Sequence, residues 1–239
     1  MLTRWSDLFD LHGVGDYLPT LLKGAATSIE LTVCILAISL PLGLAIALAK
    51  MSPRRAPRAL ASAYIEVIRG TPALLQLFYI YFVLPAFGIR FSPFLSGVIG
   101  LSINYAAYLA EVYRAGVEAV PRGQVEAAKA LGMSRGQAMR LVVLPQAIRV
   151  VIPPLGNHAI ALFKDTSLVS IVTVKELIFS GQIIAATNFQ YLTVFTIIGV
   201  IYLAFSYPSA LLVRWLERRM SVERRGAVLA AARPGAAAP

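Results

Sequence analysis

Residues 31–49 have the sequence LTVCILAISLPLGLAIALA, which is nineteen consecutive residues without a charge. A helix rises about 1.5 Å per residue and the hydrocarbon core of a bilayer is about 30 Å thick, so a run of this length can cross a membrane. Uncharged runs of 20, 20 and 23 residues follow at 70–89, 91–110 and 191–213. These four stretches predict spanning helices and decide the fold class.

The composition of the whole chain agrees with this interpretation. Its residues are 58% hydrophobic and 14% charged, and the mean hydropathy is +0.71. Soluble domains average about 45–50% apolar and about 25% charged residues. We therefore expect an all-α integral membrane protein. A fifth span is expected over residues 150–174, and the alternative for this polar, proline-containing stretch is a re-entrant or interfacial segment.

The distribution of basic residues predicts the orientation. With the N-terminus outside, sixteen Lys and Arg fall in the inside segments 50–58, 111–149 and 214–239, against four in the outside segments. Cytoplasmic loops carry such an excess, so we expect five spans with the N-terminus out and the C-terminus in. This arrangement also accounts for the net charge of +10 without nucleic acid.

Three parts of the chain follow from this topology. Residues 1–23 are expected to be an extracytoplasmic segment rather than a cleaved signal, because they lack a basic start followed by a short apolar stretch. Residues 24–216 form the transmembrane domain. Residues 217–239 form a cytoplasmic tail that we expect to be disordered, since its end is rich in Ala, Pro and Gly without a periodic apolar face.

The insert 118–149 is too charged to cross a bilayer and predicts a helical hairpin. Pro121 suits a helix start, Gly132 suits a left-handed cap, and Ser134 and Gln137 have capping-box spacing. A DNA-binding helix-turn-helix is one alternative, but an insert held between two spans argues against it. A solvated basic loop that only sets orientation is another. The sequence has no P-loop, and a single cysteine, Cys34, allows no disulfide framework.

Seven residues of this insert form a specific pattern. They are Glu126, Ala127, Ala128, Gly132, Val142, Leu144 and Pro145. The pattern resembles the EAA signature of binding-protein-dependent ABC importer permeases, EAA-x3-G-x9-I-x-LP, with Val142 in place of Ile. Residues 64–85, 104–116 and 145–172 resemble the spans of the polar amino acid branch of that family, the histidine and glutamine type.

The resemblance implies a type I importer transmembrane domain in the bacterial inner membrane. Its hairpin would be the coupling loop that docks on a separate ATPase subunit, which binds ATP-Mg, while this chain binds no cofactor and is not an enzyme. An extracytoplasmic amino-acid-binding protein would deliver the cargo, and the partner in the membrane would be a second permease subunit or a second copy of the chain. Another small polar solute is the alternative cargo, and a self-sufficient secondary transporter or channel is the alternative class.

Charged and polar residues within the predicted spans are the candidates for a substrate pathway, because charge inside a bilayer is costly and requires a partner or a function. Asp165 is the main candidate, as a carboxylate for an ammonium group, and a structural ion pair is the alternative. The weaker candidates are Lys164, His158, Asn157, Thr71 and Gln76. Two pairs with a spacing of three residues are expected to be structural ion pairs at helix ends: Glu66 with Arg69, and Glu111 with Arg114.

Overall fold

The computed structural model describes residues 14–231, with side chains described as far as Met220. Within this part of the chain every regular element is a helix. The elements are α2 (Val14–Lys50), α3 (Arg55–Arg69), α4 (Ala73–Phe78), the π-helical turn η1 (Tyr79–Val83), the 3-10 turn η2 (Leu84–Phe87), α5 (Pro93–Glu118), α6 (Arg122–Ala130), α7 (Arg135–Ala138), the π-helical turn η3 (Met139–Val143), α8 (Leu144–Asp165), the 3-10 helix η4 (Thr166–Val172), α9 (Leu177–Asn188) and α10 (Tyr191–Ala231).

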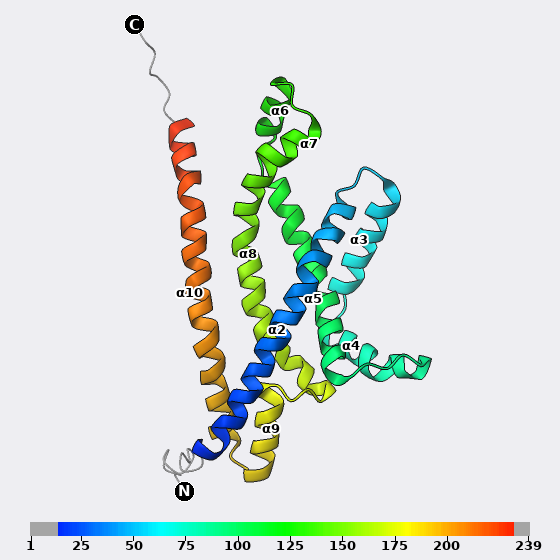
Figure 1. Ribbon diagram of the computed structural model, residues 1–239, viewed down its shortest axis with the longest axis vertical. Coiled ribbons are helices and arrows are strands. Elements are labelled where there is room, and N and C mark those ends of the chain that lie inside the picture. Colours follow the sequence, from blue (N-terminus) through cyan, green and yellow to red (C-terminus); the bar gives the residue numbers. More distant parts are fainter. Residues whose placement is uncertain (1–13, 232–239) are drawn as a thin grey trace.

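Four helical stretches are long and apolar enough to cross a membrane: α2, α5, the stretch from α7 to η4, and α10 as far as Met220. α3 and the segment 73–87 meet at a bend of 99°, and the chain has five spans if this bent pair, the second in chain order, counts as one. The expected all-α fold of about five spans is confirmed. Figure 1 shows α6 and α7 at one end of the molecule and α9 at the other.

The first span is longer than predicted. α2 begins at Val14, ahead of the expected start at Gly24, and carries Asp16 in its first turn, where a negative charge favours the helix. At Gly43 the helix lies close to α5, since a Cβ at this position would be 2.9 Å from the Cβ of Leu109. Residues 1–13 of the expected extracytoplasmic segment lie outside the described part.

The second span was predicted over residues 70–89, and the sequence Gly70-Thr71-Pro72 indicated a possible break of the helix; the structure has a break at this place. α3 ends at Arg69, and the chain turns sharply before α4 begins. Pro72 causes the break, because it has no backbone N–H and disfavours the helical conformation in Thr71. The Thr71 hydroxyl donates to the carbonyl of Val67 at 2.9 Å, which satisfies one of the last carbonyls of α3. The segment from α4 to η2 therefore projects sideways from the bundle (Figure 1).

The C-terminal helix also differs from its prediction. α10 continues to Ala231, whereas disorder was expected from residue 217. Several alanines follow residue 226, and alanine has the highest helix propensity, so this composition supports a helix without an apolar face. Residues 232–239 lie outside the described part.

The core is centred on α5. This helix packs against α2, α3, α4 and α8. In its most apolar 18-residue stretch, 67% of the residues are buried. Leu101 of α5 belongs to a cluster with Leu31 of α2, Leu77 of α4 and Leu162 of α8. α5 thus holds the bend of the second span and the end of α8 close together, and a cavity lies between them.

Candidate functional site

A cavity of about 550 Å³ lies beside the bend of the second span. Three parts of the fold surround it: the bend itself, the middle of α5, and the last turns of α8. The residues that line it are Arg69, Gly70, Thr71, Pro72, Ala73, Asn104, Tyr105, Tyr108, His158, Ala161 and Asp165. Its wall thus combines a cation, a carboxylate, an imidazole and several neutral hydrogen-bonding groups.

The bend supplies the cation. Arg69 is the last residue of α3, and its guanidinium carbon lies 5.2 Å from the ring centroid of Tyr108, within the range of a cation–π contact. The expected ion pair between Arg69 and Glu66 is not among the ion pairs of the described side chains. Because α3 stops at Arg69 instead of continuing, this arginine lies at the bend beside α5 rather than at a cytoplasmic helix end.

Gln76 stabilises the bend through hydrogen bonds to the end of α3, to the bend itself and to α5. Its amide nitrogen donates to the Thr71 hydroxyl at 2.8 Å and to the carbonyl of Ile68 at 2.9 Å, and its amide oxygen accepts from Asn104 at 3.1 Å. Thr71, which was a weaker candidate, lines the cavity, and Gln76 does not. Gln76 instead fixes the positions of two residues that do.

α8 supplies the carboxylate. One oxygen of Asp165 accepts a hydrogen bond from the Tyr105 hydroxyl at 2.7 Å. His158 lies two helical turns earlier and packs edge-on against Tyr105, with ring centroids 6.3 Å apart. The other two polar candidates on α8, Asn157 and Lys164, are exposed and do not line the cavity. Adjacent helical residues point about 100° apart, so Asn157 and Lys164 lie on a different side of α8 from His158 and Asp165. Only the side with His158 and Asp165 lines the cavity.

The sequence analysis missed the contribution of α5. Asn104, Tyr105 and Tyr108 all line the cavity, and none of them was a candidate. Their spacing of one and four residues places them on one side of a helix, in a span whose other residues are mostly apolar. This local cluster of polar side chains was the signal that could have identified them.

The hairpin has the predicted local chemistry. Gly132 adopts a φ of +77°, its N–H donates to the carbonyl of Lys129, and the N–H of Met133 donates to the carbonyl of Ala128. These two bonds form a Schellman cap at the end of α6. Ser134 and Gln137 form a complete capping box at the start of α7.

The signature residues of the hairpin differ in exposure. Ala128 is buried, whereas Glu126, Ala127, Leu144 and Pro145 are exposed. The hairpin also exposes large apolar side chains that the chain itself does not cover: Leu131 (78%), Leu141 (62%) and Met139 (45%). A charged and apolar surface of this kind is suited to contact with another protein.

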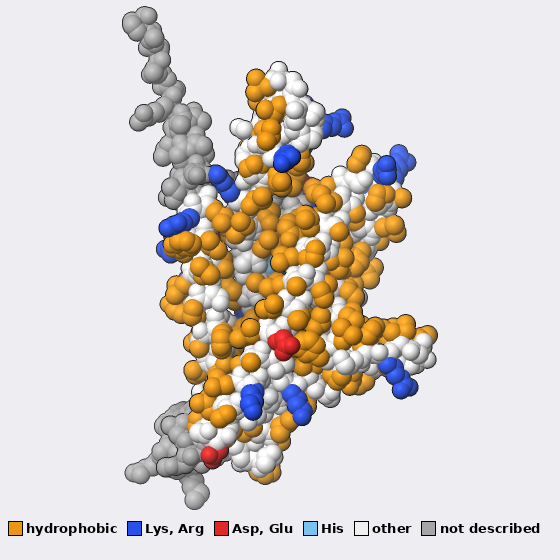
Figure 2. Space-filling model, viewed as in Figure 1, with side chains coloured by type: hydrophobic (Ala, Val, Ile, Leu, Met, Phe, Trp, Pro, Cys, Tyr) orange, Lys and Arg blue, Asp and Glu red, His pale blue; other side chains and the backbone are white. Residues whose placement is uncertain are grey.

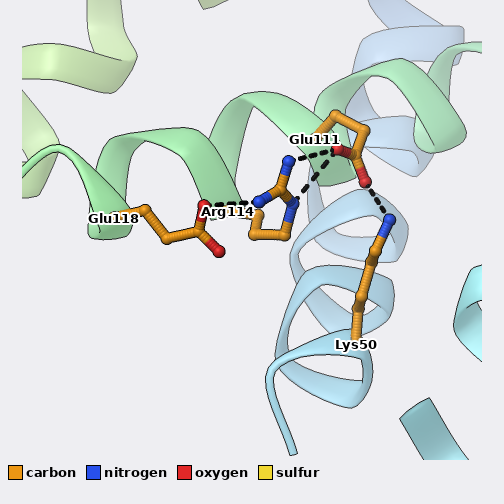
Figure 3. A network of polar contacts seen from close by, with 4 residues as sticks. All are labelled: Lys50, Glu111, Arg114 and Glu118. Carbon is orange, nitrogen blue, oxygen red and sulfur yellow. Dashed lines mark hydrogen bonds and ion pairs between the residues drawn. The ribbon is translucent and has the colours of Figure 1, made fainter.

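A charge network links α5 to α2 (Figure 3). Glu111 accepts from Lys50 at 2.6 Å and from Arg114 at 2.7 Å, and Arg114 also binds Glu118. Glu111 and Arg114 thus make the pair that their spacing indicated, and two residues outside that prediction join it. The network connects the last residue of α2 to the last residue of α5, just before the hairpin.

The carboxyl group of Glu176, at the start of α9, is fully buried. Glu176 caps the N-terminus of α9 and accepts from the N–H groups of Ile178 at 2.9 Å and Phe179 at 2.8 Å. The Ser28 hydroxyl of α2 donates to the same carboxylate at 3.4 Å. Burial raises the pKa of Glu176 to about 7, and these hydrogen bonds counteract that rise. No group of side chains suited to a metal ion occurs among the described residues.

The chain is similar in sequence to the membrane components of known transport systems. Residues 39–222 match the family described as "Binding-protein-dependent transport system inner membrane component". The glutamine transport system permease protein of Escherichia coli is 40% identical over 216 residues, which cover 90% of this chain and 99% of that protein. The L-cystine transport system permease protein of Bacillus subtilis is 42% identical over 203 residues, or 84% of this chain and 87% of that protein.

The fold has similar solved structures. One chain of a crystal structure of an amino acid ABC transporter with histidines is 40% identical, has a TM-score of 0.85, and is matched over 88% of this chain and 98% of its own length. A chain of the MetNI methionine ABC transporter has a TM-score of 0.58 at 19% identity, over 83% of this chain and 95% of that chain, which shows a shared fold alone. On the match over residues 39–222 and these full-length likenesses, this multi-pass inner-membrane chain belongs to the family of binding-protein-dependent transport system inner membrane components.

Proposed function

We propose that this chain forms the amino acid pathway of an ATP-driven importer, and that the cavity beside the bend binds a polar amino acid during transport. The observation that supports the proposal is that Arg69 and Asp165 both line the wall of one cavity. A free amino acid carries one carboxylate and one ammonium group, so a site with one cation and one anion complements it. A volume of about 550 Å³ lies within the usual range for small-molecule sites.

Each charged group has a defined role in this proposal. Asp165 receives the ammonium group through the carboxylate oxygen that Tyr105 does not occupy. Arg69 receives the carboxylate, since its planar guanidinium can make two parallel hydrogen bonds to two oxygens. His158 and the amide oxygen of Asn104 remain for the polar side chain of the cargo. The names of the relatives, which include glutamine and cystine permeases, support a polar amino acid as the cargo.

The cavity also argues for a second permease subunit. Arg69, Lys164 and Asp165 are exposed in the single chain, although they belong to segments that span the membrane. Exposed charge and a broken helix are not tolerated against lipid, but they are compatible with a protein partner or a water-filled pathway. We therefore expect a second copy of this chain, or a sister permease, on that side.

The remaining partners follow from the family and from the hairpin. We propose that the exposed side of the hairpin, including Glu126 and Leu131, docks on a cytoplasmic ATPase that holds ATP-Mg. A binding protein would deliver the amino acid on the opposite side of the membrane. The chain itself contributes the pathway and no hydrolysis.

Uptake of a labelled amino acid into proteoliposomes that contain the whole transporter tests the role of the cavity. Asp165→Asn should raise the substrate concentration needed for half-maximal uptake by roughly tenfold or more, because a hydrogen bond to a charged group contributes about 1.5–3 kcal/mol. Lys164→Gln is the matched control, since it removes a neighbouring charge outside the cavity.

Two outcomes would contradict the proposal. An equal loss of uptake in Asp165→Asn and Lys164→Gln would indicate that transport requires charge in this part of the span in general. Poor assembly of Asp165→Asn, with normal uptake by the complexes that do form, would assign Asp165 a purely structural role.

A further inference from the structure

The end of α10 that the charge distribution predicts to be cytoplasmic carries a cluster of cations around one tryptophan, which we call the α10 basic end: Arg214, Trp215, Arg218 and Arg219. Residues 191–213 of α10 contain 23 uncharged positions and so extend over about 34 Å of helix. That length is close to the thickness of a hydrocarbon core, about 30 Å. Arg214 is the first charge after this run, so the basic end begins where the hydrocarbon ends.

The side chains of this end are arranged on neighbouring helical turns. The guanidinium carbon of Arg219 lies 4.2 Å from the ring centroid of Trp215, and Trp215 is 43% exposed. Arg214 donates through Nε to the carbonyl of Ala210 at 3.3 Å. Since Nε makes that bond, the two terminal nitrogens of Arg214 remain for another acceptor. Residues four apart are neighbours on a helix, so Arg218 lies beside Arg214.

Arg214 and Arg219 of the α10 basic end differ from the basic residues at the ends of α2 and α5, because neither takes part in an ion pair among the described side chains. There, Lys50 and Arg114 are neutralised within the chain by Glu111 and Glu118. On α10, the one acidic side chain between Arg214 and Met220 is Glu217. Figure 2 shows Lys and Arg side chains at the left of the view, directly below the grey part of the chain.

The surroundings of α10 leave this cluster accessible to lipid. α10 packs on α8 and α9. In its most apolar 18-residue stretch, 17% of the residues are buried within the described chain. The described chain therefore leaves most of the surface of this apolar stretch uncovered. Tryptophan at such a depth is typical of the interface, where its ring lies at the level of the headgroups.

We propose that the α10 basic end is a binding site for the phosphate headgroup of an anionic phospholipid. Arg214 and Arg219 hold the phosphate, for which the guanidinium fork is well matched, and Trp215 packs along the lipid and keeps Arg219 in place. Clusters of basic residues directly after a span attract anionic lipids of the cytoplasmic leaflet in this way. The site is separate from the amino acid cavity and does not depend on the cargo.

The sequence offers a direct optical test, because Trp5 and Trp215 are its two tryptophans. The full-length Trp5→Phe chain is placed in phosphatidylcholine vesicles, and a fixed fraction of the lipid carries bromine, which quenches tryptophan on contact. The brominated lipid is phosphatidylglycerol in one sample and phosphatidylcholine in the other. We expect stronger quenching of Trp215 by brominated phosphatidylglycerol, and a smaller difference at high salt.

Variants assign the preference to particular cations. Each of Arg214→Gln and Arg219→Gln, in the Trp5→Phe background, should reduce the preference for phosphatidylglycerol by roughly fivefold. Preference is taken as the ratio of quenching by the two lipids within each variant, because Arg219→Gln alters the fluorescence of Trp215 itself. The matched controls Arg54→Gln and Arg58→Gln remove exposed cations from the loop before α3 and from the first turn of α3, and they should leave the ratio unchanged.

Three results would overturn the proposal. The first is equal quenching by both lipids in the Trp5→Phe chain, a comparison that needs no arginine variant to fold. The second is an equal loss of preference in the Arg54→Gln and Arg58→Gln controls. The third is disappearance of the preference when the ATPase subunit is added, which would assign these arginines to that protein surface instead.

Discussion

Replacement of Gly132 by valine tests the role of the hairpin with the least disturbance elsewhere. Gly132 has a φ of +77°, and a Cβ built on it meets no atom within 4 Å, so the substitution creates no clash. Its whole cost is conformational. A left-handed conformation costs an L-residue about 1–2 kcal/mol, and a β-branched side chain resists it further.

The expected effect follows from that cost. The two bonds of the Schellman cap, from Gly132 to Lys129 and from Met133 to Ala128, are lost if the backbone relaxes. A change of about 1–2 kcal/mol reduces the fraction of hairpins in the docking geometry by roughly 5–30-fold. The spans should not be affected, because none of their packing includes Gly132.

The assay is reconstituted transport, with permease, ATPase and binding protein in proteoliposomes. Gly132→Val should insert normally but lose most of its uptake, and loaded binding protein should no longer stimulate ATP hydrolysis. Gly136→Val is the matched control, since it makes the same change in α7, where a Cβ also meets open space but φ is not positive. Gly132→Asn should retain much of the activity, because asparagine tolerates the left-handed region.

Two outcomes would refute this reasoning. Normal uptake and normal stimulation in Gly132→Val would show that the hairpin only spaces the spans. Equal loss of activity in Gly136→Val would show that the hairpin is sensitive to any added side chain rather than to φ.

Three further predictions concern topology, pH and the charge network. In a Cys34→Ser background, a cysteine at position 182 should react with an impermeant label from outside intact cells and one at position 125 should not; the reverse pattern would overturn the N-out orientation. Because the pKa of Glu176 is raised from 4.5 to about 7, its contribution to stability is complete below pH 4.5 and is lost as pH rises through 7, by up to about 3 kcal/mol. Thermal unfolding in detergent should show this loss, Glu176→Gln should remove it, and an unchanged pH profile in Glu176→Gln would exclude Glu176 as the cause. Glu111→Lys should destabilise the junction of α2 and α5, because two positive charges then face each other at positions 50 and 111. The double variant Lys50→Glu with Glu111→Lys should restore uptake at least in part. No recovery would mean that the Lys50–Glu111 pair has no separate role.

Local chemistry was predicted most reliably. The left-handed Gly132 and the capping box of Ser134 and Gln137 depend on residues within a few positions of each other, so the sequence contains all the information they need. The pair of Glu111 and Arg114 was found for the same reason, whereas Lys50, which is 61 positions away from Glu111, was not. Contacts between distant residues depend on how the spans pack.

The break of the second span shows the limit of a hydropathy argument. Residues 70–89 are uncharged and so indicated a span, and Gly70, Thr71 and Pro72 indicated that its helix could break, but hydropathy gives neither the bend angle nor what packs against the bend. Pro72, together with the hydrogen bonds of Thr71 and Gln76 to the end of α3, makes a bend of 99° more favourable than a continuous helix. As a result Arg69, which was expected to pair with Glu66, lines the cavity instead.

The sequence by itself determined the class of this protein, the number of its spans, the hairpin and the family that it resembles. The class, the spans and the hairpin follow from segment length, apolar content and short-range capping, which are properties of neighbouring residues, whereas the family is indicated by the resemblance of residues 126–145 to its signature. Only the tertiary structure decided which polar residues form one site. His158 and Asp165 face Tyr105 across the gap between α8 and α5, while Asn157 and Lys164 do not, although both pairs have the same spacing. The physical reason is that a helix repeats every 3.6 residues and so offers several equivalent polar columns, and only the packing of other helices around it selects the column that lines the cavity.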